Sequence, residues 1–311
     1  MKRILRIGTR ASLLALTQSE WVKGQIEARL PEVTVELVHI STKGDRILDV
    51  PLAKIGGKGL FVKEIEDALL QNDIDLAVHS MKDVPTVLPA GLHIGLIPVR
   101  EEPRDAFVST RYANLEALPN GAIVGTSSLR RKAQLLALRP DLQLRDLRGN
   151  VGTRLQKMDD GEFDAIILAG AGLNRLGLRA RIAELLAPTE MLPAIAQGAL
   201  GIELRQKDRE LLDALYFLHD RATAIPVAAE RAFLTRLEGG CQVPIGAHAT
   251  LQGETLTLTG LIASVDGKEL LQETRQAPSA AAAQLGKGLA EELLAKGGRA
   301  ILESVYNTHI S

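Results

Sequence analysis

The sequence has 311 residues, a formal net charge of −1, 46% hydrophobic residues and 24% charged residues. These values predict roughly two or three globular domains and exclude a disordered chain. Aromatic residues make up only 3% of the chain, which together with the near-zero net charge disfavours nucleic-acid binding. A single cysteine excludes an intramolecular disulfide and a cysteine-rich zinc site. Because the sequence contains neither a secretory signal nor a long apolar run, we expect a cytoplasmic protein.

Strand and helix patterns alternate through the first 170 residues. Such alternation is typical of parallel βαβ units and doubly wound sheets. Two series of this kind predict two similar α/β lobes with a cleft between them. The expected strands cover residues 5–10, 33–40, 74–79, 93–99, 105–109, 122–125, 142–147 and 165–169, and the expected helices cover 12–30, 61–70, 129–138 and 151–158.

The pattern changes after about residue 209. Two helical stretches, 210–218 and 224–237, come before two alternating strands at 247–251 and 255–261. A helix rich in alanine and leucine follows near 280–295. This order predicts a small C-terminal α+β domain.

Residues 41–60 fit neither a helix nor a strand. The segment holds four glycines, one proline and four lysines or arginines. Long loops within domains are usually functional or disordered. Two interpretations stay open, a plain surface loop and a basic flap over an anionic site.

Positive charge is concentrated in the middle of the chain. Residues 100–181 hold 12 arginines and 2 lysines against 10 acidic residues, a local balance of +4. Arginine forms bidentate contacts with carboxylates and phosphates. This part of the chain is therefore where we expect an anion to bind.

Two strand–helix junctions in this region combine polar groups with arginines. The segment GTSSLRR (125–131) follows an apolar strand and opens a helix, and RGNVGTR (148–154) repeats the arrangement. Free backbone N–H groups and the helix dipole attract anions at such junctions. The carboxyl ends of neighbouring parallel strands share one edge of the sheet, so these arginines, together with Arg175 after the next strand, could converge. The competing interpretation is a plain helix cap with solvated arginines.

The first lobe offers polar groups at two strand ends. Arg10 and Ser12 end one strand and begin a helix, and HSMKDVP (79–85) ends another. Asp83, held before a rigid Val-Pro pair, can transfer protons or stabilise a developing cation. It could equally be a turn-forming aspartate.

Cys241 lies in the segment EGGCQVPIG (238–246). A lone cysteine is most often an inert core residue. Here two glycines precede it, and glycine permits close approach of the backbone to a ligand. A thiol in this position can form a covalent adduct.

Motifs of several other enzyme classes are absent. The sequence contains no P-loop, no zinc-protease H-E-x-x-H and no G-x-S-x-G elbow. The glycine-rich stretch at 170–175 has Arg175 where a dinucleotide fingerprint needs its third glycine. The six histidines are scattered, and we predict no metal site.

Together, these segments resemble the porphobilinogen deaminase family, also called the hydroxymethylbilane synthase family. HSMKDVP, GTSSLRR, RGNVGTR and EGGCQVPIG carry the resemblance, and further matches cover nearly all of residues 5–250 in family order. They include LRIGTRASLLAL, DVPLAKIGGKGLFVKEIEDALL, PRDAFVS, DAIILAGAGLNRLGL and PAIAQGALGIE.

The resemblance implies two lobes like type-2 periplasmic binding proteins and a third domain that carries the cysteine. The implied first lobe comprises residues 1–99 and 196–218 with a flap at 41–60, the second lobe 100–195, and the C-terminal α+β domain 219–311. It also implies a dipyrromethane cofactor attached to Cys241 through a thioether. Four porphobilinogen molecules are then added head to tail with loss of ammonia, and water releases hydroxymethylbilane.

The family's functional positions fall on matching residues of this sequence, with Asp83 as the catalytic aspartate. Many of the others would bind the acetate and propionate groups of the pyrrole rings. The resemblance places cofactor contacts at Ser80, Lys82, Asp83, Thr126, Ser128, Arg130, Arg131, Arg148, Gly149 and Cys241. It places substrate contacts at Arg10, Ser12, Gln18, Arg148, Arg154, Arg175 and Gln197, and flap contacts at Lys54, Lys58 and Phe61.

The resemblance further implies a cytoplasmic monomer in haem-type tetrapyrrole biosynthesis, with product hand-over to uroporphyrinogen-III synthase and no nucleic-acid or membrane partner. Two alternatives stay open. One is a two-lobe anion-binding protein without catalysis, and the other is a catalytically inactive relative. The absence of an export signal and the presence of Cys241 argue against the first, and the retention of every motif position argues against the second.

Overall fold

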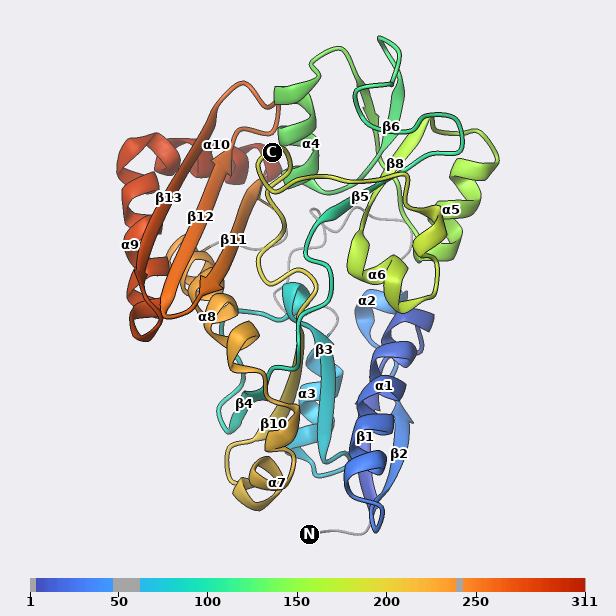
Figure 1. The fold of residues 1–311 in the computed structure, drawn as a ribbon, viewed down its shortest axis with the longest axis vertical. Helices are drawn as coiled ribbons and strands as arrows, with labels where there is room; N and C mark the ends of the chain where they lie inside the picture. The colour runs from blue at the N-terminus through green and yellow to red at the C-terminus, as the bar shows by residue number, and fades with distance from the viewer. Residues whose placement is uncertain (1–3, 47–61, 239–242, 311) are drawn as a thin grey trace. The chain divides into compact units, whose positions relative to one another are not determined.

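The computed structural model describes residues 4–46, 62–238 and 243–310. The described chain divides into two compact units. The first contains residues 4–46, 62–101 and 199–224, and the second contains 102–198, 225–238 and 243–310. Because the chain leaves the first unit after residue 101 and returns at 199, the first unit is built from segments far apart in the sequence (Figure 1).

The first unit is a five-stranded sheet with helices on both faces. The strand order is β2-β1-β3-β10-β4, in which β1, β2 and β3 are parallel and β10 runs antiparallel to β3 and β4. Its elements are β1 (Ile4–Thr9), α1 (Leu13–Arg29), β2 (Thr34–His39), α2 (Lys43–Arg46), α3 (Lys63–Leu70), β3 (Leu76–Ser80), a 3₁₀ turn (Met81–Asp83), β4 (Leu92–Leu96), β10 (Leu200–Arg205), α7 (Arg209–Ala214) and a 3₁₀ turn (Tyr216–Leu218).

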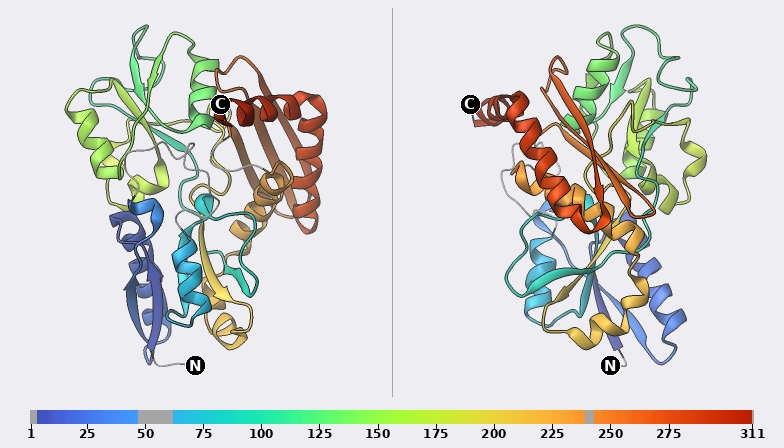
Figure 2. Two further views of the ribbon diagram at one scale, coloured as in Figure 1. Left: turned by 180° about the vertical axis from the view of Figure 1, so that it is seen from behind. Right: turned by 60° about the vertical axis from the view of Figure 1, so that its left-hand side comes forward.

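Alternating side chains of this sheet enter two separate cores. Leu76 and Val78 of β3 pack with Val22 and Ile26 of α1 on one face. Ala77 packs with α3 on the other face, and Figure 2 shows α1 and α3 on opposite sides of the sheet. Successive residues of a strand point to opposite faces of the sheet, and both faces of this sheet are covered by helices. The apolar residues of strand β3 are therefore buried on both sides.

The second unit repeats this topology. Its sheet has the order β7-β6-β8-β5-β9, with β6, β7 and β8 parallel and β5 antiparallel to β8 and β9. The elements are β5 (Asp105–Val108), β6 (Ile123–Gly125), α4 (Leu129–Leu138), β7 (Gln143–Arg145), α5 (Val151–Asp159), β8 (Ala165–Ala169), α6 (Gly170–Arg175), a 3₁₀ turn (Arg179–Arg181) and β9 (Glu184–Leu185).

The second unit also contains a three-stranded antiparallel sheet of order β11-β12-β13. Helix α8 packs closely on this sheet and on α9, because Gly260 lies against the Phe233 ring and Gly286 against the backbone of Ala229. The elements are α8 (Arg221–Arg236), of which residues 221–224 belong to the first unit, β11 (Ile245–Gln252), β12 (Thr255–Ala263), β13 (Leu270–Pro278), a 3₁₀ turn (Ser279–Ala281), α9 (Ala282–Leu293), a π-type turn (Leu294–Gly298) and α10 (Arg299–Ile310).

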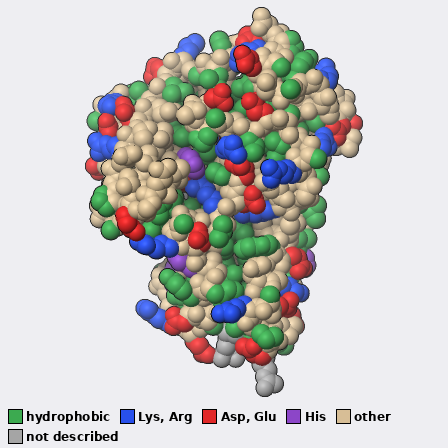
Figure 3. All heavy atoms as spheres, viewed as in Figure 1, with side chains coloured by type: hydrophobic (Ala, Val, Ile, Leu, Met, Phe, Trp, Pro, Cys, Tyr) green, Lys and Arg blue, Asp and Glu red, His purple; other side chains and the backbone are tan. Residues whose placement is uncertain are grey.

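The outer side of this C-terminal sheet is polar. Ion pairs join Lys296 to Glu273 and Arg275 to Glu292 along β13, and in Figure 3 acidic and basic side chains border an area of neutral polar side chains and backbone on this part of the molecule. Exposed pairs of this kind contribute less than about 1 kcal/mol each.

The predicted α/β class with a small C-terminal α+β part is confirmed. The sequence prediction missed the elements β9, β10, β13, α6 and α10. It also expected only parallel strands in the lobes, whereas each lobe sheet contains one strand that runs antiparallel to its neighbours. One helical turn, α2, forms at the start of the segment predicted to lack regular structure. The three-domain boundaries remain a prediction. No helix in the described part of the chain has both the length and the apolar character needed to cross a bilayer.

Candidate active site

The end of β3 places a carboxylate at the edge of the first sheet. Strand β3 stops at Ser80, and the chain turns through Met81–Asp83 before Val84 and Pro85. The Met81 side chain is buried and its backbone N–H donates to the Ala199 carbonyl at 3.0 Å. This anchored turn leaves Asp83 exposed at the carboxyl end of the strand.

The start of α1 lies beside this turn. Ser12 caps the helix by accepting a hydrogen bond from the Ala15 N–H at 3.4 Å. One turn further, the buried Gln18 donates from Nε2 to the Ser80 hydroxyl at 2.8 Å. This contact joins α1 to the end of β3.

A pocket of about 70 Å³ opens at this edge. It brings together five of the predicted site residues from two strand ends and one helix, while Val62 and Ile65 contribute apolar wall. The predicted residues that line it are Arg10, Ser12, Gln18, Ser80 and Asp83. Lys82 lies in the same turn and is half-buried.

A buried group of titratable side chains lies next to this pocket. His79, which also lines the pocket, has its Nε2 2.9 Å from Oε2 of Glu203 on β10. Burial, with the nearby Glu203 charge, raises the pKa of Glu66 to about 7. Glu66 therefore titrates near neutral pH although an exposed glutamate does not.

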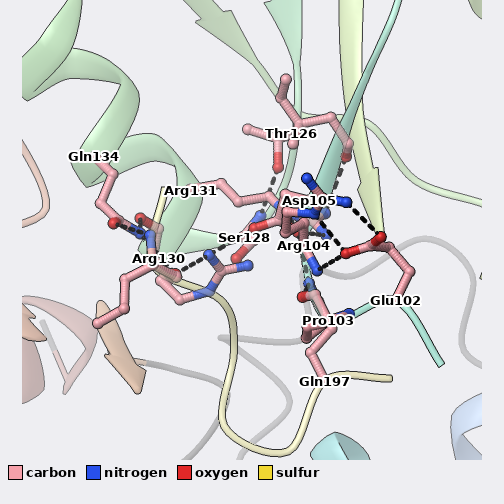
Figure 4. A network of polar contacts seen from close by, with 12 residues as sticks. Glu102, Pro103, Arg104, Asp105, Thr126, Ser128, Arg130, Arg131, Gln134 and Gln197 are labelled. Carbon is pink, nitrogen blue, oxygen red and sulfur yellow. Dashed lines mark hydrogen bonds and ion pairs between the residues drawn. The ribbon is translucent and has the colours of Figure 1, made fainter. Parts of the chain in front are cut away.

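In the second unit, the junction between β6 and α4 is the place where the sequence predicts an anion site (Figure 4). Ser128 occupies the N-cap of α4 but makes no capping hydrogen bond with its side chain. Thr126 is buried, and its hydroxyl accepts a hydrogen bond from the Ser128 N–H at 3.3 Å. The first N–H groups of α4 have no capping side chain, so they and the Ser128 hydroxyl can act as donors to an anion.

Arg130 and Arg131 lie in the first turn of α4, and both are buried. Both pair with the fully buried Asp105 of β5, at 2.8 Å for Arg130 and 2.6 Å for Arg131. Gln197 donates to the same carboxylate at 3.0 Å. The structure therefore joins Arg130, Arg131 and Gln197, three predicted site residues, through a carboxylate that the sequence analysis did not select.

The junction between β7 and α5 is hydrogen-bonded to the junction between β6 and α4. The Ser127 hydroxyl donates to the Leu147 carbonyl and accepts from the Leu147 N–H, both at 3.0 Å. The predicted residues Arg148 and Gly149 follow directly. Gly149 has a φ of +113°, and a Cβ there would lie 2.8 Å from the Thr153 side chain. Glycine is thus required where the chain enters α5.

Two further predicted arginines bind backbone carbonyl groups. Arg154 donates from Nε to the Gly149 carbonyl at 2.7 Å, and Arg175 donates from Nη2 to the Gly198 carbonyl at 2.8 Å. Asn150 caps α5 by accepting from the Thr153 N–H at 2.9 Å. Both guanidinium groups are therefore positioned by local contacts.

Four predicted residues lie outside the described part of the chain: Cys241, Lys54, Lys58 and Phe61. The predicted site residues that lie in the described part of the chain fall in both units. Arg10, Ser12, Gln18, Ser80, Lys82 and Asp83 belong to the first unit, and Thr126, Ser128, Arg130, Arg131, Arg148, Gly149, Arg154, Arg175 and Gln197 to the second.

Comparison with known proteins identifies the family. The model described as "Porphobilinogen deaminase, dipyromethane cofactor binding domain" matches residues 5–213, and the model of the porphobilinogen deaminase C-terminal domain matches residues 224–295. The chain belongs to the porphobilinogen deaminase family. A porphobilinogen deaminase of Trichlorobacter lovleyi is 58% identical over 99% of this chain and 98% of its own length. That of Syntrophotalea carbinolica is 60% identical over 97% of this chain and 96% of its own length.

Solved structures also match, with lower similarity. A nutrient binding protein from Burkholderia cenocepacia, bound to methionine, matches with a TM-score of 0.42 and 14% identity over 68% of this chain and 90% of that chain. The periplasmic aliphatic sulphonate binding protein SsuA from Escherichia coli matches with a TM-score of 0.39 and 17% identity over 76% of this chain and 71% of that chain.

The residues of the second unit fit the carboxylate-bearing cofactor of the porphobilinogen deaminase family. Two guanidinium groups face one carboxylate, which leaves one positive charge in a buried cluster. Among the described residues, no hydrogen bond from Nε or Nη2 of Arg130 is found. Ser128 and the N-terminus of α4 add neutral donors. This donor set suits an organic carboxylate.

Sequence reasoning missed two buried carboxylates that organise this region, Asp105 and Glu230. Glu230 of α8 accepts from the backbone N–H groups of Ala196 and Ala249 at 2.6 and 2.8 Å. The signal for Asp105 was available, because a single acidic residue begins the apolar strand in PRDAFVS. No comparable signal marks Glu230, which lies among several charged residues on α8.

Proposed function

We propose that this chain is a transferase that condenses four porphobilinogen molecules head to tail, releasing one ammonia for each, and then hydrolyses the product off as hydroxymethylbilane. Growth starts on a dipyrromethane primer held by Cys241 through a thioether. Family membership over nearly the whole chain supports this proposal. The observation that carries it is the pocket that gathers Asp83 with Arg10, Ser12, Gln18 and Ser80.

Asp83 is the proposed catalytic residue. Departure of ammonia leaves a positive charge on the pyrrole that loses it, and a fixed carboxylate stabilises such a charge. The same carboxylate can hold or transfer a proton during the condensation. Its turn, anchored through Met81, keeps it at the pocket.

The basic residues are proposed to bind the acetate and propionate groups of the pyrrole rings. Arg10 and Ser12 serve the pocket of the first unit. In the second unit, the β6–α4 junction and the arginines at 148, 154 and 175 would bind these carboxylates. When bound, the dipyrromethane supplies the pyrrole carbon onto which the first unit is added. Arg130, Arg131 and Ser128 would hold its carboxylates, which fits their donor set.

A cytoplasmic location, a monomeric state and hand-over of product to uroporphyrinogen-III synthase belong to the same proposal. They depend on the family resemblance alone.

The activity is tested by incubating the purified full-length chain with porphobilinogen. Substrate consumption, ammonia release and hydroxymethylbilane formation are measured together, and four ammonia molecules are expected for each hydroxymethylbilane. Substrate binding without ammonia release would favour the alternative of an anion-binding protein without catalysis.

The role of Asp83 is tested with Asp83→Asn. Turnover should fall by at least about 100-fold, since proton transfer and charge stabilisation by a positioned side chain contribute this much or more. Asp73→Asn, at an exposed aspartate of the same unit outside the pocket, is the matched control. Unchanged turnover in Asp83→Asn would remove Asp83 from its role.

A further inference from the structure

The first turn of α4 holds an arrangement that is unfavourable unless another group compensates it. Arg130 and Arg131 are only 4% and 7% exposed. Cations are destabilised at a helix N-terminus by the helix dipole. Burying a guanidinium group costs free energy unless its charge is paired and its N–H groups are bonded. Something must therefore hold both side chains in place.

Asp105 provides that compensation. Its Oδ1 accepts from Nε and Nη2 of Arg131 at 2.9 and 2.6 Å, and its Oδ2 pairs with Nη1 of Arg130 at 2.8 Å. Gln197 donates to Oδ1 at 3.0 Å and to the Pro103 carbonyl at 2.8 Å. Figure 4 shows the two arginine side chains converging on this carboxylate.

Backbone carbonyl groups complete the fixation of both guanidinium planes. Arg131 donates from Nη1 to the Ile167 carbonyl at 2.9 Å, and Arg130 donates from Nη1 to the Leu192 carbonyl at 2.6 Å. Gln134 binds both the N–H and the carbonyl of Leu192, which fixes that acceptor on α4. Each plane is thus held at two different acceptors.

The carboxylate stays ionised in this environment. Burial alone would raise the pKa of Asp105, but the guanidinium groups of Arg130 and Arg131 outweigh burial and hold that pKa well below its usual range. One negative charge therefore faces two positive charges, and the cluster retains one positive charge. Arg130 keeps Nε and Nη2 as donors for which no partner is found among the described residues.

We propose that Asp105 is a positioning residue, which fixes the guanidinium groups of Arg130 and Arg131 and leaves one unit of positive charge for a carboxylate of the bound pyrrole chain. Asp105 acts through the two arginines and does not itself contact the ligand. The identity of that ligand rests on the proposed function, whereas the cluster itself is a property of the structure.

The test compares the loading of the dipyrromethane by Asp105→Asn and by the unaltered full-length chain. Each protein is produced in cells that cannot make porphobilinogen and is then given porphobilinogen, and its gain in mass is followed over time. Loading by Asp105→Asn should be at least about 10-fold slower, since hydrogen bonds to charged groups carry this much free energy. Asp141→Asn is the matched control, because Asp141 pairs with Arg139 at the far end of α4. This variant should load within about 2-fold of the unaltered chain, as expected for an exposed pair.

A double-mutant cycle separates positioning from general structural support. If Asp105 acts through the arginine pair, the combined variant Asp105→Asn with Arg131→Gln should lose less loading rate than the product of the two single losses, because both changes disturb the same cluster. Thermal melting in a Cys241→Ser background, where no protein carries the cofactor, reports on the fold of each variant. Should Asp105→Asn fail to fold, Asp105→Glu, which keeps the ionised carboxylate but displaces it, takes its place in the cycle.

Two results would overturn the proposal. One is loading by Asp105→Asn within 2-fold of the unaltered chain, and the other is a loss of loading rate in the double variant equal to the product of the two single losses. Failure of the proposed function gives a different result, because the unaltered chain itself would then gain no mass.

Discussion

The imidazole of His79 and the carboxylate of Glu203 face each other across β3 and β10, 2.9 Å apart and almost completely buried. Glu66 of α3 belongs to the same group, and Lys63 and Asp67 are the other charged groups of α3 that act on it. Among the described residues, one oxygen of Glu66 and one of Glu203 have no hydrogen-bond partner. Burial raises the pKa of Glu66 and so favours its protonated form, which makes the stability of the first unit depend on pH near neutrality.

The raised pKa of Glu66 sets the direction of that dependence. Its pKa is about 7 in the folded chain, against 4.5 for an unperturbed glutamate. Because protonated Glu66 is favoured in the folded state, its contribution to the free energy of unfolding is fully present below pH 4.5. This contribution is lost as the pH rises through 7. Between pH 5 and pH 8, Glu66 should therefore lower the free energy of unfolding by roughly 2–3 kcal/mol.

Glu66→Gln should remove most of this dependence, because an amide does not ionise. The measurement is the free energy of unfolding from urea titrations at pH 5 and pH 8. Glu20→Gln, at an exposed glutamate on α1, serves as the control and should keep the dependence of the unaltered chain. If the free energy of unfolding changed with pH as much in Glu66→Gln as in the unaltered chain, Glu66 would not be the source of the pH dependence.

Gln18 should influence substrate binding more than the chemical step, because it orients Ser80 at the pocket edge. Gln18→Leu removes this contact and a polar group of the pocket. We expect KM for porphobilinogen to rise by about 10-fold, the value of one hydrogen bond of roughly 1.4 kcal/mol, with a smaller change in kcat. Gln25→Leu, at an exposed position of α1, should leave both constants unchanged. A fall in kcat at constant KM would show that Gln18 acts in the chemical step instead.

The sequence predicted the elements of the lobes well where local signals were strong. Helix α4 was predicted with its observed bounds, since an apolar strand precedes it and its polar junction marks the start. Strand β10 was missed because it pairs with β3 and β4, more than 100 residues earlier in the chain. Strand β13 was missed because its side chains are mostly polar and exposed at the edge of a sheet.

The same limit applies to the candidate site. Residues at strand ends could be selected from the sequence, because the carboxyl ends of parallel strands share one edge. Asp105 could not be linked to Arg130 by spacing, since the contact joins β5 to α4 and the two residues lie 25 positions apart in the sequence. Arginines predicted as free anion ligands proved to be fixed by internal partners, a feature that depends on the packed structure.

Glu230 should be a large contributor to the stability of the second unit. It is fully buried, and its two oxygens accept the N–H groups of Ala196 and Ala249. Glu230→Ala leaves both donors without this acceptor, so we expect a loss of roughly 2–4 kcal/mol. Glu230→Gln keeps one carbonyl oxygen and should lose less.

The comparison for this prediction is Glu291→Ala, which removes an exposed ion pair with Arg236. It should cost less than about 1 kcal/mol. Urea unfolding of the three variants measures these differences. Equal losses in Glu230→Ala and Glu291→Ala would show that the buried carboxylate does not tie these segments together.

The central claim is that this chain carries a covalent pyrrole primer on Cys241 and extends it with porphobilinogen. Intact mass of the active, purified chain tests it most directly, with Cys241→Ser measured beside it. We expect the unaltered chain to exceed its sequence mass by two linked pyrrole units and Cys241→Ser to show its sequence mass alone. An active chain at its bare sequence mass would contradict the account.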